Sequence, residues 1–589
     1  MSMLPLDPVI ARLRVRSPRR DGADLRLDVT RELSADALRP RHLAPSSILL
    51  VRRVELVTNG SLSHSNELAR ARRQRAVQSR MQGIRDRAVR PLRGLIDPGS
   101  EALLFADEAE LIACLALQFV LAGETRSWWC HAVSRYFSTS SLFALLDSRI
   151  ELLPGVFTLL NDWRAAAPVA LKLPVAECIE LREALVRQRE LRHLDGAIRV
   201  ALRGSEPPSM GASVAATDER VSGFASERAE SKSSPRATVP GGLVNLLSGN
   251  SPFDPWLEAP CYSLDLQREL LLGVALGASK DPRTLGSRGF ALAVARWLSD
   301  AGRRESRRLA LPDKATGTSA SPVPSFAAGS SELRDLPVGE TPAIHANGAT
   351  SSAAPGADAA DAPATIEAGI LAQQPEPDSR ALEGEVTELG GMFMLINVME
   401  YLGLPECFED PCGLASSVGT IGILESLARV LAGTRGEELA HDPIWSMLAS
   451  LDGREPHSPP RAEGLRNPGD RLPAAWLAQL GDEALAPRES DRLAVEALRR
   501  AGWPPALLDW LTLVMPFIGW RIARACALES VDEAVRLLID LPARIYVTKS
   551  HIDVVTSIEN IRVPVRLAGL DRSPGWVRSI QRVVLFHFE

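Results

Sequence analysis

Residues Thr316–Gly369 read TGTSASPVPSFAAGSSELRDLPVGETPAIHANGATSSAAPGADAADAPATIEAG. The stretch consists mainly of Ala, Gly, Ser, Thr, Pro and Asp, and it has almost no large apolar side chain. Such a composition cannot offset the conformational entropy that is lost when a backbone becomes ordered. The sequence therefore predicts a disordered linker over 303–384. A folded lobe is expected on each side, at 1–302 and 385–589, and the two lobes are expected to lie at a variable distance from each other.

The N-terminal lobe is predicted to combine a small β element with helices. The β element is placed within 1–60, because Val9–Val15 and Ser47–Val57 are rich in β-branched residues and are bounded by Pro, Gly and Asp. The rest of the lobe follows in order: an Arg-rich helix over 66–93, a helical core over 103–300, and a low-complexity insertion at 205–245 within that core.

The helical core is predicted to contain a capped, buried helix followed by two core tryptophans. Asp107 is expected to cap a helix over 107–123, with Glu110 three positions later, and this helix is apolar on every side, so it must be buried. Trp128 and Trp129 follow at helical spacing. We interpret them as core residues rather than as a binding platform.

The C-terminal lobe is predicted to begin with helices and to finish as a small sheet over 543–589. Ser530 and Glu533 match a capping box that starts a helix. After Pro542 the apolar period becomes two, which predicts a strand over 563–567, with Pro564 tolerated at an edge, and a closing strand over 582–588. The expected fold class is thus α+β, mostly α, with two helical lobes and small β elements at the N-terminus and C-terminus.

Composition narrows the functional class. A net charge of −6 is too mild to imply a polyanion or polycation as partner, although residues 1–100 are basic. The seven cysteines are scattered without a C-x-x-C pair, so they are expected to act as small buried hydrophobic residues in a reducing compartment. Pro and Asp interrupt the apolar core that a signal peptide would need, and no membrane span is expected. These features favour a cytoplasmic protein.

Motif searches identify no established reaction. The sequence has no G-x-x-x-x-G-K-[ST], strand-linked G-x-G-x-x-G, H-E-x-x-H, G-x-S-x-G or EF-hand pattern. Cys407 and Cys412, with His441 downstream, fall short of a four-ligand zinc site. We therefore expect no metal, no cofactor and no small-molecule ligand.

Two patterns nevertheless offer chemistry. His551 and Asp553 share strand parity, and His587 on the last strand could lie near them; an imidazole oriented by a carboxylate suits general base catalysis, and a sheet face that exposes His and Asp to water explains the same pattern. The Arg-rich stretch 66–93 is either a solvated helix face or an electrostatic surface for nucleic acid or an acidic protein. No aromatic residue separates its arginines, so stacking on single strands is not indicated.

Four phrases carry a resemblance to a known family: LAPSSILLVRRVEL and LLFADEAELIACLA in the N-terminal lobe, and GGMFMLINVMEYLGL and HIDVV with AGLDRSPGWVRSIQRVVLFHFE in the C-terminal lobe. They resemble an uncharacterised bacterial family associated with gene clusters for extracellular, phage-tail-like contractile injection systems. The resemblance covers the outer segments of both lobes and implies a structural or assembly role beside a large particle. It implies no catalytic residue.

Three interpretations follow from these observations. The first is a non-enzymatic interaction or assembly protein that acts with a contractile injection particle or its AAA-type ATPase, and it is favoured over an enzyme. The second is a hydrolase that uses His551, Asp553 and His587. The third, which the sequence favours least, is a nucleic-acid-associated factor that binds through 66–93.

Overall fold

The computed structural model describes residues 38–41, 43–56, 67–91, 99–122, 127–203, 251–257, 264–310, 382–404, 417–462, 474–480 and 488–589, with a few single gaps and isolated residues. The predicted strand over 9–15, the insertion at 205–245, and Cys261, Cys407 and Cys412 lie outside these ranges. Within them, the predicted fold class is confirmed: the protein is mostly helical and carries a small sheet near each end of the chain.

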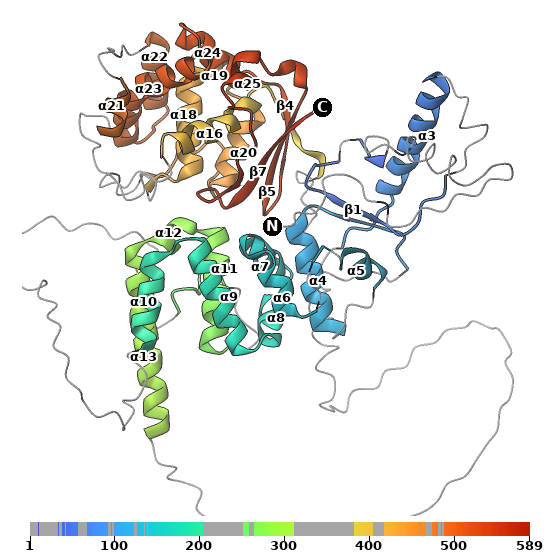
Figure 1. Ribbon diagram of the computed structural model, residues 1–589. Helices are drawn as coiled ribbons and strands as arrows, with labels where there is room; N and C mark the ends of the chain where they lie inside the picture. Colours follow the sequence, from blue (N-terminus) through green and yellow to red (C-terminus); the bar gives the residue numbers. More distant parts are fainter. Residues whose placement is uncertain are drawn as a thin grey trace, which may run out of the picture.

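The N-terminal lobe is a layered helical body with a two-stranded antiparallel sheet at one side (Figure 1). Its elements are, in order, β1 (Ile48–Val51), α3 (Glu67–Arg85), β2 (Ala102–Phe105), α4 (Glu108–Ala122), α5 (Trp128–Val133), α6 (Leu142–Asp147), the 3₁₀ helix η2 (Ile150–Leu152), α7 (Leu153–Asp162), α8 (Ala166–Lys172), α9 (Val175–Gln188), α10 (Arg192–Arg203), α11 (Leu266–Lys280), α12 (Pro282–Gly286) and α13 (Arg288–Ala310).

The core of this lobe confirms the predictions made for α4 and for the tryptophans. Asp107 caps α4, since its Oδ1 accepts the amide N–H of Glu110 at 2.8 Å. The Glu110 carboxylate in turn accepts the amide N–H of Ala106. Trp129 is fully buried and lies 5.9 Å from Phe105, ring centre to ring centre, and Trp128 packs beside it, partly buried. The aromatic pair therefore belongs to the hydrophobic core.

The C-terminal lobe is a helical bundle packed on a mixed sheet (Figure 1). Its elements are β3 (Glu385–Thr387), the 3₁₀ helix η4 (Gly390–Met394), α16 (Leu395–Tyr401), α18 (Thr420–Ala432), α19 (Thr434–Glu438), α20 (Pro443–Leu451), α21 (Ala474–Leu480), α22 (Glu489–Arg500), α23 (Pro505–Ala525), α24 (Val531–Ile539), β4 (Ala543–Val547), β5 (His551–Thr556), the 3₁₀ helix η6 (Ile558–Asn560), α25 (Val563–Leu567), β6 (Gly575–Val577) and β7 (Arg582–Phe588).

The sheet has the order β3-β4-β5-β7-β6, in which β5 and β7 run parallel and the other neighbours are antiparallel. It confirms the predicted sheet over 543–589 and the strand over 582–588, and it adds β3 from the start of the lobe. The capping box is also confirmed, because Ser530 Oγ accepts the amide N–H of Glu533 at 3.2 Å, at the start of α24.

The predicted strand over 563–567 is wrong, because these residues form α25. Pro564 lies in the first turn, where its fixed φ fits a helix and no amide hydrogen bond is lost. Only Val565 points inward; Val563 and Leu567 are exposed. The alternation V-P-V-R-L therefore does not mark one buried face of a strand.

One further boundary differs from the one expected. Helix α13 continues to Ala310, past the predicted lobe boundary at 302, since RRESRRLA is composed mainly of residues that tolerate helix well.

Helix α23 is, among the described residues, the one helix long and apolar enough to cross a membrane. Of its most apolar stretch, 61% is buried inside the protein, and the helix packs on α18, α22 and α24.

The two lobes contact each other directly, in contrast to the variable separation expected from the linker. The ends of β5 and β7 point at α4 and α7 of the N-terminal lobe (Figure 1). Val583 of β7 packs against the N-terminal core, and hydrogen bonds join Ser550 to Asp107 and Asp553 to Ser46. A second contact joins Arg283 of α12 to Asp452, which follows α20. The lobes are thus docked at two places.

Candidate functional site

The sequence-predicted residues His551, Asp553 and His587 meet at the docking surface between the lobes. Strand β5 pairs in parallel with β7, with Asp553 opposite Leu585 and Val555 opposite His587. Residues of equal parity share one face of a sheet, so Asp553 and His587 are diagonal neighbours. His587 Nε2 lies 3.0 Å from Asp553 Oδ1, which confirms that these two side chains are brought together.

The predicted solvation of this face is wrong. Asp553 is fully buried and His551 is 7% exposed, while the side chain of His587 remains 21% exposed. The reason is that the N-terminal lobe covers this part of the sheet. The loop before β1 supplies the amide N–H of Ser46, which donates to Asp553 Oδ2 at 3.1 Å.

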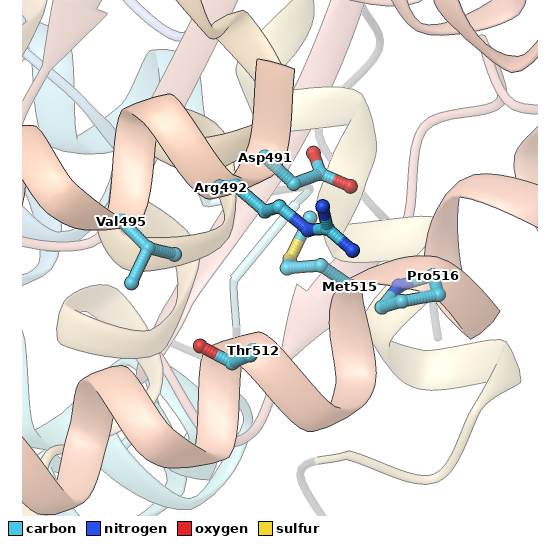
Figure 2. A pocket seen from close by; sticks show the side chains of 6 residues that line it. All are labelled: Asp491, Arg492, Val495, Thr512, Met515 and Pro516. Carbon is cyan, nitrogen blue, oxygen red and sulfur yellow. The ribbon is translucent and has the colours of Figure 1, made fainter. Parts of the chain in front are cut away.

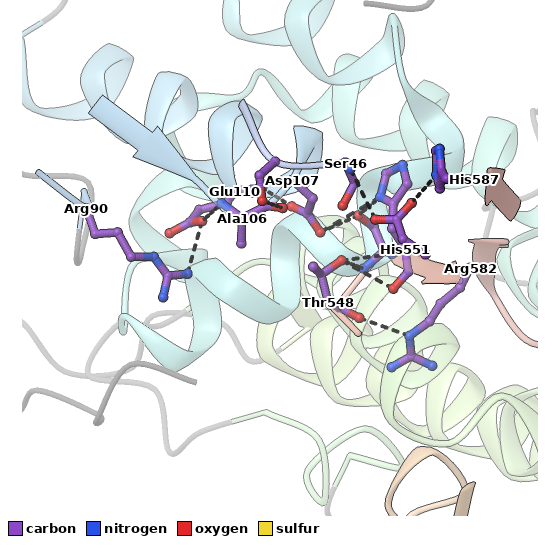
Figure 3. A network of polar contacts seen from close by, with 12 residues as sticks. Ser46, Arg90, Ala106, Asp107, Glu110, Thr548, His551, Arg582 and His587 are labelled. Carbon is purple, nitrogen blue, oxygen red and sulfur yellow. Dashed lines mark hydrogen bonds and ion pairs between the residues drawn. The ribbon is translucent and has the colours of Figure 1, made fainter. Parts of the chain in front are cut away.

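His551 does not pair with Asp553 but contacts Asp107 of the opposite lobe through Ser550. Figure 3 labels Asp107 and His551, the two ends of this contact. Ser550 Oγ lies 2.6 Å from Asp107 Oδ2 and 2.8 Å from His551 Nδ1. The direct distance from His551 Nδ1 to Asp107 Oδ2 is 3.9 Å, so the hydroxyl bridges the two groups. A protonated imidazole donates to Ser550 Oγ, which in turn donates to the carboxylate. We call the set Ser46, Asp107, Ser550, His551 and Asp553 the hairpin junction.

The turn between β4 and β5 holds this geometry. Thr548 and His551 close the turn, since the amide N–H of Thr548 donates to the carbonyl of His551 at 2.9 Å, and the amide N–H of His551 donates to Thr548 Oγ1 at 2.9 Å. Arg582 Nε donates to the Thr548 carbonyl at 3.1 Å. Short polar side chains that bond to nearby backbone favour turns, and here they direct Ser550 and His551 at the start of α4.

The charges of the hairpin junction stabilise one another. Burial alone would raise the pKa of Asp107, but the His551 imidazolium and the hydroxyls of Ser550 and Thr548 outweigh it and hold that pKa well below its usual range. Burial alone would lower the pKa of His551; the nearby carboxylates, Asp107 above all, raise it instead. Burial lowers the pKa of Arg582 to about 10, so this guanidinium stays charged. The junction is therefore a buried ion pair with a cation beside it.

The residue types of a hydrolase triad are present, but their connectivity differs. In a triad the imidazole lies between hydroxyl and carboxylate and uses both ring nitrogens. Here the Ser550 hydroxyl lies between His551 and Asp107, and it donates to the carboxylate instead of to the imidazole. Ser550 is 2% exposed. A buried hydroxyl whose proton is held by a carboxylate has neither access to a substrate nor a base positioned to activate it.

Weaker ion pairs also join the lobes near the junction, and in each pair the cation comes from one lobe and the anion from the other. Arg578 Nη1 lies 2.7 Å from Glu190 Oε2, and Lys549 Nζ lies 3.8 Å from Asp162 Oδ2. At this contact the C-terminal lobe supplies cations and the N-terminal lobe supplies anions. At the second contact the charges are reversed: the N-terminal lobe supplies the cation, Arg283, and the C-terminal lobe supplies the anion, Asp452. Such complementarity fixes how two surfaces dock more than how tightly they bind.

One small cavity lies away from the junction, between α22 and α23 (Figure 2). Its volume is about 20 Å³, and its lining includes Arg492, Thr512 and Pro516. A space of this size holds about one water molecule. It is too small for a substrate.

The other sequence-predicted groups give no reactive centre within the described residues. Cys114, Cys130, Cys178 and Cys526 are buried thiols, as predicted, and burial raises the pKa of Cys178 to about 11. Across the described ranges, no group of three or more potential metal ligands occurs. His441 is exposed, and its suggested partners Cys407 and Cys412 lie outside the description, so that metal hypothesis stays untested.

The Arg-rich stretch forms α3, which is shorter than the 66–93 expected. Val77, Met81 and Ile84 pack against the β1–β2 sheet, while Arg72 and Arg75 are exposed on the opposite side. The helix is thus anchored by one apolar stripe and presents a basic face to solvent.

Sequence reasoning missed the N-terminal half of the junction. Asp107 was identified only as a helix cap, and nothing in the sequence marks Ser550 as its partner or Ser46 as the partner of Asp553. The comparisons add no assignment: no family model, no curated protein and no solved structure matches this chain.

Proposed function

We propose that the chain is a non-enzymatic, cytoplasmic interaction or assembly protein whose docked lobes bind protein partners. The observation that carries this proposal is the burial of His551 and Asp553, the strand residues with catalytic potential, in contacts that join the lobes. A catalytic assignment needs converging roles around a space where a substrate can react. The enclosed polar network instead suits a protein whose function depends on a fixed arrangement of two lobes.

The family resemblance supplies the proposed partner, a contractile injection particle or its AAA-type ATPase. Two features of the chain are compatible with an assembly role. The lobes dock at two places, and the lobe that supplies the cation at one place supplies the anion at the other, which fixes their relative orientation. The N-terminal lobe also keeps a basic helical face, α3, exposed.

The test is a pull-down of purified particle, and separately of its ATPase, with the full chain. We expect stoichiometric binding by the wild type and weaker binding by His551→Ala, because loss of the junction frees the lobes from their fixed orientation. Arg500→Ala is the matched control, since it removes an exposed cation of the same lobe at the end of α22, away from the docking surface (Figure 1). A hydrolase panel run on the same proteins should show no turnover. Failure of both baits to bind would refute the proposal.

A hydrolase remains the second candidate, and one observation favours it. Asp553 lies in hydrogen-bond contact with His587, whose side chain is partly exposed, so an oriented imidazole reaches the edge of the junction. Turnover of any panel substrate that His587→Ala abolishes, with an unchanged melting curve, would establish this candidate. Such a result would also displace the assembly role.

Nucleic-acid binding is the third candidate, and it rests on the exposed Arg72 and Arg75 of α3. Phosphate contacts make affinity depend steeply on salt, with a slope of about −0.9 per phosphate neutralised on duplex DNA. Binding of duplex DNA or RNA with a steep slope, reduced by Arg72→Glu with Arg75→Glu, would support it. Salt-independent or absent binding removes it.

A further inference from the structure

A groove lies between α10 and α13. These two helices form the side of the N-terminal lobe that is far from the hairpin junction (Figure 1). The volume of the groove is about 360 Å³. This volume lies within the range of roughly 300–1,000 Å³ that is common for ligand sites. Val200 of α10 is 73% exposed and Leu292 of α13 is 53% exposed, so the groove has apolar walls that face solvent.

Small side chains make the floor of this groove. Gly196 and Ala197 come from α10, and Ala291 and Ala295 come from α13. A Cβ built at Gly196 would meet no atom within 4 Å, so no described side chain fills the space above it. Gly196 and Val200 are one helical turn apart on α10, as are Ala291 and Ala295 on α13, so the residues that line the groove form two short rows. Rows of this spacing accept the ridge of another helix.

The polar members of the lining are all basic. They are Arg192, His193 and Arg288, and no Asp or Glu belongs to the lining. Arg192 Nη2 lies 3.7 Å from Glu190 Oε2, an exposed carboxylate that Arg578 Nη1 contacts more closely, at 2.7 Å. Arg192 and Arg288 therefore leave the lining with an excess of positive charge, although the chain as a whole has a net charge of −6. Cations around an apolar floor complement a ligand with an apolar stripe and acidic flanks.

We propose that this groove, which we call the apolar groove, binds an amphipathic helix of a protein partner. The apolar stripe of that helix lies against Gly196, Ala197 and Ala291, between Val200 and Leu292, and its Asp or Glu residues face Arg192 and Arg288. This is the helix-in-groove mode, in which anchors at i, i+3/i+4 and i+7 enter an apolar channel. The inference rests on the proposed interaction role and names one surface and one kind of partner for it.

The test uses two synthetic peptides of about 18 residues, or five helical turns. Both carry leucines at i, i+3, i+7 and i+10; one has Glu on the flanks of this stripe and the other has Lys. Fluorescence anisotropy with the full chain measures binding. We expect the Glu-flanked peptide to bind about tenfold more tightly than the Lys-flanked one, a difference that this assay resolves well.

Gly196→Leu fills the groove without strain, because open space lies above Gly196. This variant should weaken binding of the Glu-flanked peptide by about tenfold or more. Gly289→Leu is the matched control: Gly289 also faces open space, lies on α13, and does not line the groove. Its affinity should equal that of the wild type. Equal binding of both peptides, or no effect of Gly196→Leu, overturns the proposal.

Two other occupants give distinct outcomes. Dimerisation of the chain without peptide that Gly196→Leu abolishes would assign the groove to a second copy. A rise in peptide affinity when Ile366, Ile370 and Leu371 are all replaced by Ser in the full chain would assign it to the acidic stretch 358–378 of the same chain. Either result overturns the partner helix. If no peptide binds while the particle or ATPase is still pulled down, the groove is wrong and the interaction role stands.

Discussion

The hairpin junction joins the two lobes, whereas the apolar groove lies on the N-terminal lobe alone, and the two regions have opposite chemistry. The junction is charged, hydroxyl-rich and buried, whereas the groove is apolar, lined by small side chains and open to solvent. A buried ion pair gains little net free energy, because the loss of hydration offsets the attraction. This small gain is sufficient to dock two lobes of one chain, because their covalent linkage keeps the effective concentration of each lobe near the other high. A partner from solution has no such advantage and needs apolar burial, which contributes about 25 cal/mol per Å².

The largest effect is expected from breaking the junction at Asp107. Asp107→Ala removes a helix cap and leaves the buried cations without their anion, so we expect a loss of about 3–5 kcal/mol in the free energy of unfolding. Urea unfolding of the full chain measures it. Asp107→Asn keeps an oxygen that can cap the helix and removes only the negative charge. It should therefore lose less free energy of unfolding than Asp107→Ala. A loss below about 1 kcal/mol for Asp107→Ala would mean that the junction contributes no more than an exposed pair.

Changing the pH should weaken the junction from both sides. The pKa of His551 is raised, so its contribution is complete below about pH 6.5, the usual value, and is lost as pH rises through the raised pKa. The pKa of Asp107 is lowered, so its contribution is complete above about pH 4 and is lost as pH falls toward the lowered pKa. Asp553, Glu108 and Arg582 also face this pair.

We therefore expect stability to be greatest between about pH 4 and 6.5 and to fall above that window, by about 1.4 kcal/mol for each unit by which the pKa of His551 is raised. Denaturant unfolding from pH 5.5 to 8.5 measures this fall. His551→Gln should flatten the profile over the same range. A wild-type profile that is already flat would refute the ion pair.

A smaller effect is expected at the second contact between the lobes. Gly419 precedes α18 with a φ of +78°, and a Cβ there would come within about 2 Å of the Arg283 guanidinium. Gly419→Ala should cost about 1–2 kcal/mol from backbone strain and should displace Arg283 from Asp452. Arg283→Ala is the comparison variant. If the double variant loses as much free energy of unfolding as the two single variants together, the two changes do not act through the same contact.

The smallest effect, with the opposite sign, is expected in the apolar groove. Gly196 lies inside α10 and faces open space, so Gly196→Ala removes backbone freedom from the unfolded chain without any clash. We expect a gain of about 0.5–1 kcal/mol in the free energy of unfolding. Thermal and urea unfolding measure it. A loss would show that the groove is filled.

Local signals in the sequence were sufficient for most elements. Asp107 and Ser530 start helices because a short polar side chain before an apolar run can accept an amide N–H, and this depends only on neighbours in the chain. Strand β7 followed from the alternation in 582–588. The pairing of Asp553 with His587 could also be anticipated, since parity places both on one face once the strands are neighbours.

The remainder depended on contacts between distant residues. The alternation in 563–567 suggested a strand, and only the packing of Val565 shows that one side of a helical turn is buried there. Asp553 was expected in water because a polar residue on a strand usually faces solvent. Its burial depends on the loop at Ser46, which lies 507 residues away in sequence. No local pattern carries that information.

The sequence distance across the hairpin junction also has a consequence for synthesis. Asp107 and Ser550 are separated by 443 residues. At a translation rate of about 5–20 residues per second, the N-terminal lobe waits roughly 20–90 s before its counterpart exists. An apolar docking surface left bare for that time would invite aggregation, whereas a carboxylate at the start of a helix stays hydrated. The polar character of the junction thus protects the newly made lobe while the ribosome completes the other.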